Sequence, residues 1–410
     1  LIRRTQVRLR GLGFRERHER EIAAEDLVRI DTCWAVSTGL GLVDYVIGSY
    51  FQTRGLLLAL DAGEPRRIAR ALAMEANYSS ASGGAAARRS AELVRSTQDL
   101  ARRLGDPYSM AWASGAEGIT AALEGRWKVG HEATERAEAI FRERCTGASW
   151  EIASMRWFSL WSLSYLGDLG ELSRRIPERL REAKGRGDLY AEICHSTGLA
   201  NLFWLAADNP VEARAHNREA LRAWSQRKFH VEHWWAMLSE RQIDLYLGDG
   251  EAAFRGVEQQ WPALSGSLLL MVQLTKLEAT HLHARAALML ATQRPSQRRA
   301  MLKSALADAA KIEKEEMPWS TPLAALLRAG AARIDGEKAR ALLLLQEAIT
   351  GLDSADMALY AAAARYHRGN LLGGDEGQRI AAAADQWLEK QGVVNRPRMV
   401  GMLAPGFPEE

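Results

Sequence analysis

Apolar residues recur along most of the chain at steps of three and four positions, which places them on one face of an α-helix. Residues 157–165 carry one such series and residues 199–205 carry another. The surrounding segments are rich in Ala, Leu, Glu and Arg, which are strong helix formers. The pattern therefore predicts an all-α protein.

The breaks between these predicted helices recur with a period of about 41 residues. The tetrapeptide YLGD occurs at residues 165–168 and again at residues 246–249, and Asp208 lies between the two copies at the same phase. A second series of glycines, at positions 105, 147 and 187, runs out of phase with the first. Each period therefore holds two turns, which is typical of stacked helical hairpins.

A turn of this kind needs a glycine that ends one helix in the left-handed conformation and an acidic residue that caps the next helix. The residues predicted to form the turns are Gly125, Gly167, Asp168, Asp208, Gly248, Asp249, Gly336 and Gly374. We expect an all-α, right-handed superhelical solenoid of about seven stacked hairpins, tetratricopeptide-like but with longer helices.

The periodicity divides the chain into four regions. Residues 1–33 are Arg-rich and are predicted to form an entry helix or linker from an upstream module, and the first residue is Leu1, so we expect a longer parent protein. Residues 34–104 are predicted to form an irregular first helical unit, with a loop at 77–86. Residues 105–390 hold the repeats. Residues 391–410 are expected to be a C-terminal cap that ends in a non-helical tail.

Charge and composition narrow the class of partner. The chain has 54 Lys and Arg against 51 Asp and Glu, a near balance that gives no general reason to expect nucleic acid or a membrane surface. Three glutamates dilute the Arg-rich start, which favours a solvated helix over a nucleic-acid-binding arm. The apolar runs are too short to cross a membrane, and three scattered cysteines fit a reducing cytoplasm.

No catalytic signature is complete in the sequence. A GxxxxGK[ST] phosphate loop is absent, the glycines at 39–48 lack the context of a dinucleotide site, and HRGN at 367–370 lacks the aspartate of a kinase catalytic loop. We therefore expect no catalytic residue, no cofactor and no kinase or ATP-hydrolysing activity in this chain.

The histidines permit a sharper hypothesis. His230 and His233 are three residues apart, and with His281 and His283 they would bind zinc if the fold brought the two pairs together. We favour the alternative that His230 and His233 line a groove or cap a hairpin, and we predict no metal site. Cys194 and His195 are adjacent, so their side chains diverge on a helix and do not suggest a catalytic pair.

The thirteen tryptophans have two interpretations. They fill an enlarged core, or some of them line the concave face as anchors for a partner, because aromatic residues and arginine dominate binding energy. In tetratricopeptide-like stacks the first helix of each hairpin lines that face. The predicted binding residues are Arg156, Trp157, Trp161, His195, His230, His233, Trp234 and Arg241.

Several longer segments together resemble a known family. They include RIDTCWAVSTGLGLVD at 29–44, FQTRGLLLALDAGEPRRIARALAMEA at 51–76, AEAIFRERCTGASWEI at 137–152, WPALSGSLLLMVQL at 261–274 and ADMALYAAAARYHRGNLLGGDEG at 355–377. The chain looks like the C-terminal tetratricopeptide-like region of large bacterial Hanks-type serine/threonine kinases. In that family a kinase domain and an AAA/STAND-type ATPase module precede the region.

The resemblance implies a role and no reaction, because the kinase and ATPase motifs of the family lie upstream of the matching region. It implies a non-catalytic, signal-sensing region that binds a protein or peptide segment, with the upstream modules of the same protein as candidate partners. One alternative is a sensor that binds a small-molecule inducer among the aromatic rings. Another is an enzyme that uses the histidines and a metal.

Overall fold

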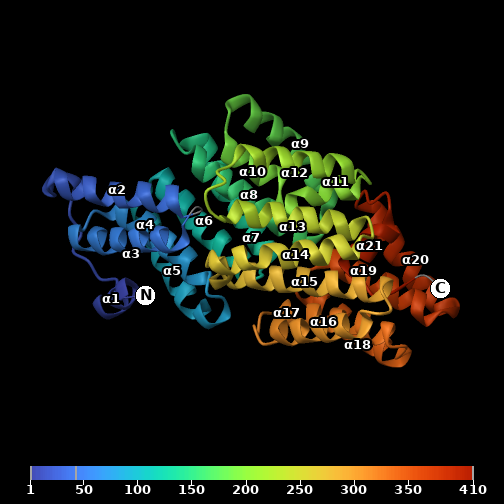
Figure 1. Ribbon diagram of the computed structural model, residues 1–410. Coiled ribbons are helices and arrows are strands. Elements are labelled where there is room, and N and C mark those ends of the chain that lie inside the picture. Colours follow the sequence, from blue (N-terminus) through green and yellow to red (C-terminus); the bar gives the residue numbers. More distant parts are fainter. Residues whose placement is uncertain (1, 42–43, 409–410) are drawn as a thin grey trace. The chain divides into compact units, whose positions relative to one another are not determined.

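The computed structural model describes residues 2–41 and 44–408 (Figure 1). Within these ranges every regular element is a helix and no strand is present, so the predicted all-α class is confirmed. None of the described helices is both long and apolar enough to cross a lipid bilayer.

The helices group into two compact units. The first unit comprises Leu1–Glu124 and Val129–Ser159, and the second comprises Gly125–Lys128 and Leu160–Glu410. The helices of the first unit are α1 (Ile2–Arg10), α2 (Ala24–Leu40), α3 (Tyr45–Ala62), α4 (Pro65–Ser80), α5 (Ala87–Leu104), α6 (Pro107–Leu123), most of α7 (Trp127–Arg144) and the start of α8 (Ser149–Leu166).

The second unit begins within α8 and continues almost to the end of the chain. Its further helices are α9 (Leu169–Arg186), α10 (Leu189–Ser196), α11 (Leu202–Ala206), α12 (Pro210–Ala223), α13 (Val231–Tyr246), α14 (Gly250–Gly266), α15 (Gln273–Gln293), α16 (Arg298–Glu313), α17 (Ser320–Ile334), α18 (Lys338–Ser354), α19 (Ala358–Leu372), α20 (Gly374–Lys390) and α21 (Arg396–Leu403). Four short 3-10 helices lie between them: η1 (Glu19–Glu21), η2 (Gly84–Ala86), η3 (Gly198–Asn201) and η4 (Leu269–Met271).

Consecutive helices from α6 to α20 form the seven hairpins that the period predicts, if α10, η3 and α11 are taken together as one first helix. That helix is broken because Gly198 has a φ of 65° and lies against Trp235 of α13. The side-chain amide of Asn201 donates to the carbonyl of Ser196, just before the break, at 3.1 Å. It also donates to the carbonyl of Ala213 in α12 at 2.9 Å. The right-handed superhelical path stays a prediction.

The predicted turn chemistry is present at both copies of YLGD. Gly167 and Gly248 have φ values of 82° and 74°, and Asp168 and Asp249 accept hydrogen bonds from amides three residues ahead, at 3.1 and 2.9 Å. Gly125, Gly336 and Gly374 also have positive φ. Left-handed backbone carries the least penalty for glycine, so the recurrence follows from the repeated bend.

The turn at Asp208 differs from the prediction by one residue. Asp208 itself has a φ of 53°, and the side chain of Asn209 caps α12 by accepting from the Glu212 amide at 3.4 Å. Aspartate therefore takes the place of glycine here, and asparagine takes the place of the capping aspartate. The Asp208 carboxylate is left to accept a hydrogen bond from the Tyr246 hydroxyl at 2.8 Å.

The N-terminal third is more regular than predicted at one place and less regular at another. Helices α2 to α5 form two ordinary hairpins, and the predicted loop at 77–86 is shorter because α4 continues to Ser80. Residues 1–33 do not form a single entry helix, because α1 ends before Gly11, which has a φ of 75°. The segment after it contacts the hairpins, with Arg17 donating to the Gly63 carbonyl at 2.9 Å through its amide.

In the later hairpins the first helix, such as α15, and the second helix, such as α16, differ in how many of their faces are buried. In α15 most residues from Leu274 to Ala291 are buried, on every side of the helix. In α16 the buried residues form one stripe whose apolar members are Leu302, Ala305, Ala309 and Ile312. A helix that is buried all round lies inside a core, so the first helices form an inner layer that the second helices cover.

The predicted C-terminal cap reaches far into this inner layer. The Val394 amide donates to the Ala206 carbonyl at 2.8 Å, and the Arg285 guanidinium donates to the Met402 carbonyl at 3.1 Å. Met399, Val400, Met402, Leu403 and Ala404 are buried. Residues 404–408 are non-helical, as predicted for the tail, and residues 404–406 are buried in the second unit.

We expect the two YLGD glycines to differ in their tolerance of a methyl group. A Cβ on Gly167 would lie 2.7 Å from the Leu359 backbone nitrogen, whereas a Cβ on Gly248 would have no atom within 4 Å. Gly248→Ala should lower the free energy of unfolding by about 1–2 kcal/mol through backbone strain alone. Gly167→Ala should lower the free energy of unfolding by roughly 1–3 kcal/mol more than Gly248→Ala does, because the added methyl group overpacks the turn. Urea denaturation of both variants measures the difference, and equal losses would contradict the packing of this turn on α19.

Candidate functional site

The eight residues predicted to bind a partner are divided between the two units. Arg156 and Trp157 lie on the part of α8 that belongs to the first unit, and the other six lie in the second. Arg156 forms an ion pair with the buried Glu138 of α7 at 3.0 Å, and Trp157 is half-buried, with its ring edge-on to Phe158. Binding by these residues stays a prediction.

Trp161 belongs to a buried polar cluster in the second unit. Its ring nitrogen donates to Glu278 of α15 at 3.0 Å, and the Tyr165 hydroxyl donates to the same carboxylate oxygen at 2.6 Å. Tyr165 also stacks on Trp127, at 4.1 Å between ring centroids. Trp234 is fully buried. For Trp161 and Trp234, burial supports the interpretation that these tryptophans are core residues.

Glu278 is the central titratable group of this cluster. Complete burial raises its pKa to about 7, against the opposing effect of hydrogen bonds from Tyr165 and Trp161 and of the charge on Arg285. Glu232, at the start of α13, is likewise buried, and burial raises its pKa to about 8. Both carboxyls therefore hold a proton to higher pH than they would in the unfolded chain.

The predicted histidines serve as structural groups. His195 and His230 are buried, and the His233 ring accepts a hydrogen bond from the His230 amide at 3.0 Å, a capping contact at the start of α13. Burial and the neighbouring His230 lower the pKa of His233. His283 is engaged elsewhere, with Glu258 at 3.1 Å and with Asp308. Among the described residues no group of three or more His, Cys, Asp or Glu is placed to hold a metal ion.

Arg241 faces its own hairpin, which differs from its predicted place on a concave binding face. Its guanidinium donates to the Ala252 carbonyl of α14 at 3.0 Å and pairs with Asp244 at 3.1 Å. It lies so close to Gly256 that a Cβ there would be 1.6 Å from one of its nitrogens. The side chain thus fills the contact between α13 and α14.

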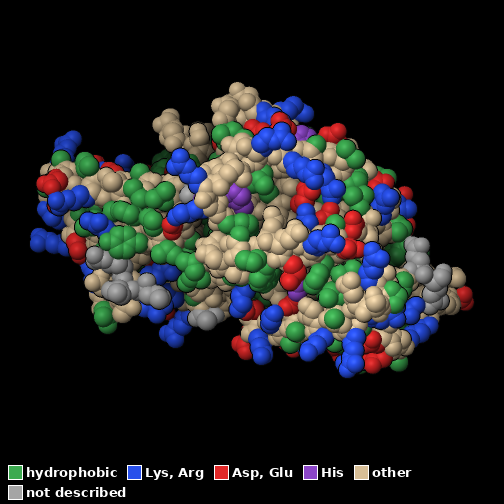
Figure 2. Space-filling view, viewed as in Figure 1, with side chains coloured by type: hydrophobic (Ala, Val, Ile, Leu, Met, Phe, Trp, Pro, Cys, Tyr) green, Lys and Arg blue, Asp and Glu red, His purple; other side chains and the backbone are tan. Residues whose placement is uncertain are grey.

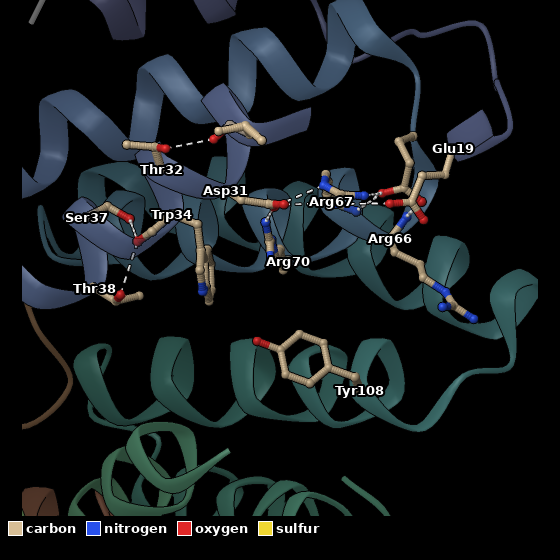
Figure 3. A network of polar contacts seen from close by, with 12 residues as sticks. Glu19, Asp31, Thr32, Trp34, Ser37, Thr38, Arg66, Arg67, Arg70 and Tyr108 are labelled. Atoms are coloured by element: carbon tan, nitrogen blue, oxygen red, sulfur yellow. Dashed lines mark hydrogen bonds and ion pairs between the residues drawn. The ribbon is translucent and has the colours of Figure 1, made fainter. Parts of the chain in front are cut away.

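A network of charged groups joins α2 to α4 in the first unit (Figure 3). Asp31 accepts two hydrogen bonds from Arg67, both at 2.9 Å, and also contacts Arg70. The two guanidiniums lower the pKa of Asp31 even though burial opposes this. Arg70 in turn lies over the Trp34 ring, 5.0 Å from its centroid. This arrangement satisfies its own charges, so we assign it to the stability of the helix pair.

An open groove lies on the surface of the second unit between α18, α19 and α20. Its volume is about 840 Å³, and three arginines line it together with Asp353, Glu376 and apolar side chains. We call it the α18–α20 groove. Sequence reasoning missed it, although Arg365 and Arg368 stand out as basic residues three positions apart on a helix that is otherwise mostly apolar.

No known protein family matches the chain, and no curated protein matches it at a significant level.

We expect a pH dependence of stability that Glu278→Gln removes in part. Because folding raises the pKa of Glu278 from 4.5 to about 7, the native state binds the proton more tightly than the unfolded chain. Its contribution to stability is present below pH 4.5 and declines as the pH rises, by about 3 kcal/mol at pH 7. The difference in unfolding free energy between the wild type and Glu278→Gln, measured by denaturation from pH 4.5 to pH 8, should follow this curve.

The matched control is Glu389→Gln, at an exposed position of α20. Its stability should run parallel to that of the wild type over the whole pH range. A Glu278→Gln curve that is also parallel would show that Glu278 titrates alike in the folded and unfolded chain.

We expect Arg241→Ala to destabilise the fold. The change removes the donor to the Ala252 carbonyl and one partner of the buried Asp244, so the unfolding free energy should fall by about 1–3 kcal/mol. Arg255→Ala breaks an exposed ion pair between Arg255 and Glu251, both on α14. It should lower the unfolding free energy by less than about 1 kcal/mol. Thermal denaturation distinguishes the variants. An Arg241→Ala variant as stable as the wild type would show that its contacts with Ala252 and Asp244 contribute little to the fold.

Proposed function

We propose that this chain is a non-catalytic helical-repeat region that binds protein segments within a signalling protein. The observation that carries the proposal is the α18–α20 groove, an open concave surface lined by arginines on a stack of helical hairpins. Stacked hairpins commonly present extended binding surfaces.

The proposed partners follow from the resemblance to the C-terminal regions of kinase–ATPase fusion proteins. In that setting the bound segment belongs to the upstream kinase or ATPase modules, or to a substrate that the region recruits. The near balance of charge on the chain agrees with a protein partner. On the face shown in Figure 2, basic and acidic side chains are interspersed. A cytoplasmic location fits this role.

The alternative of a small-molecule sensor receives less support from the aromatic residues. It requires tryptophans that surround a space for an inducer, whereas Trp161 is bonded to Glu278 and Trp127 and Trp319 pack against Tyr165. These rings are used in contacts within the unit. We therefore retain the small-molecule effector only as the second arm of the experiment below.

A thermal-shift screen with two arms tests the proposed function. One arm presents a library of short peptides of mixed charge, and the other presents a library of cytoplasmic metabolites. A ligand that binds only the folded state raises the Tm, by an amount equivalent to about 2.7 kcal/mol when its concentration is 100 times its Kd. We expect stabilisation by peptides. Stabilisation by metabolites alone, or by neither arm, would contradict the proposal.

A further inference from the structure

The α18–α20 groove combines three arginines with an apolar surface. Arg365 and Arg368 come from α19 and Arg379 comes from α20, and Ile349 of α18 and Ile380 of α20 lie among them. The residues come from two consecutive hairpins, α17/α18 and α19/α20, which appear in orange to red in Figure 1. The groove therefore depends on how these two hairpins stack.

The three arginines differ in how far their charge is already used. Arg365 pairs with Asp353 of α18, and both side chains are exposed to water. Arg379 donates through Nε to the Asp375 carbonyl at 3.3 Å, which is a contact with a neutral group. Arg368 forms no hydrogen bond or ion pair with any residue in the described part of the chain, and its Nε is shielded from solvent without an acceptor.

A guanidinium in this position favours an incoming anionic acceptor. A ligand cannot reach the shielded Nε, but the two terminal nitrogens of Arg368, a residue that lines the groove, are not shielded in this way and can donate to a ligand oxygen. A hydrogen bond between a guanidinium and a carboxylate is also roughly twice as strong as one between neutral groups. Arg368 is thus the best-placed anchor in the groove.

The remaining lining distinguishes among anionic ligands. Asp353 and Glu376 stand in the same groove, so a continuous phosphate backbone would meet like charge at two places. A small free anion would leave the apolar side chains of Ile349 and Ile380 uncovered. A peptide can place carboxylates opposite the arginines and aliphatic side chains against the isoleucines, with neutral positions opposite the two acids.

We propose that the α18–α20 groove binds a peptide segment in which acidic and aliphatic side chains alternate, with a carboxylate on Arg368. This inference rests on the proposed function and names the chemistry of its ligand. A carboxylate of the bound peptide accepts hydrogen bonds from the Arg368 guanidinium, and its aliphatic side chains cover Ile349 and Ile380. Binding weakens as salt screens the charges.

The test is a fluorescence-anisotropy titration with a dye-labelled peptide of alternating Glu and Leu. The control probe replaces each Glu by Gln, and inorganic phosphate and a single-stranded oligonucleotide serve as competitors. We expect the chain to bind the Glu–Leu peptide and to bind the Gln–Leu peptide at least about tenfold more weakly, because a charge-assisted hydrogen bond is lost. Neither competitor should displace the peptide at equimolar concentration.

Three variants locate the site. Arg368→Ala should weaken binding about tenfold or more, while Asp353→Asn, which removes an acid from the groove, should tighten it about two- to threefold. Arg340→Ala is the matched control, since this exposed arginine of α18 pairs with Glu337 outside the groove. It should bind like the wild type. The Asp353→Asn gain cannot arise from a variant that fails to fold.

Two results would overturn the inference. One is equal binding of the peptide to the wild type, Arg368→Ala and Asp353→Asn, and the other is displacement by phosphate or the oligonucleotide. If the Glu–Leu peptide does not bind while the peptide library still stabilises the chain, the groove assignment fails and the proposed function stands. If no peptide binds in either experiment, both fail.

Discussion

A helical hairpin must reverse its direction within a few residues, and each reversal leaves backbone carbonyls and amides without helical partners. This chain meets that constraint with the same two groups repeatedly, a residue in the left-handed conformation and a side chain that caps the following amides. Gly167 with Asp168 and Gly248 with Asp249 are the simplest instances. The stacking of the hairpins depends on these turns, because each turn sets where the next helix begins.

The second unit adds a feature that stacking alone does not require. Its inner helices are bridged by contacts between residues far apart in the sequence, such as Tyr165 with Glu278 and Arg285 with Met402. Glu278, whose pKa is raised, and the buried Arg285 both lie in this layer, on α15. Two predicted binding residues of this unit, Trp161 and Arg241, bond to groups on other helices of the unit, whereas the α18–α20 groove is on its surface.

The sequence predicts what is decided locally. The period, the all-α class and the left-handed glycines follow from helix-forming composition and from turn chemistry, which act over a few residues. At Asp208 the same logic erred by one position, because aspartate also tolerates positive φ and Asn209 caps equally well. The directions of Arg241 and Trp161 were not predictable, because a helical repeat leaves open which neighbour a side chain meets. The groove escaped prediction for a related reason, since it depends on residues from three helices.

The C-terminal segment has a consequence for how the protein is made. The Ala206 carbonyl at the end of α11 receives its hydrogen bond from the Val394 amide, and the Asp208 carboxylate is met by Asn395 and Arg398. A ribosome that adds about 5–20 residues per second reaches these partners roughly 10–40 s after it has passed residue 208. The early hairpins can form as they emerge, but the inner layer of the second unit is completed only after residues 394–404 have been synthesised. Until then the nascent chain presents unfinished apolar surface to the chaperones around the exit tunnel.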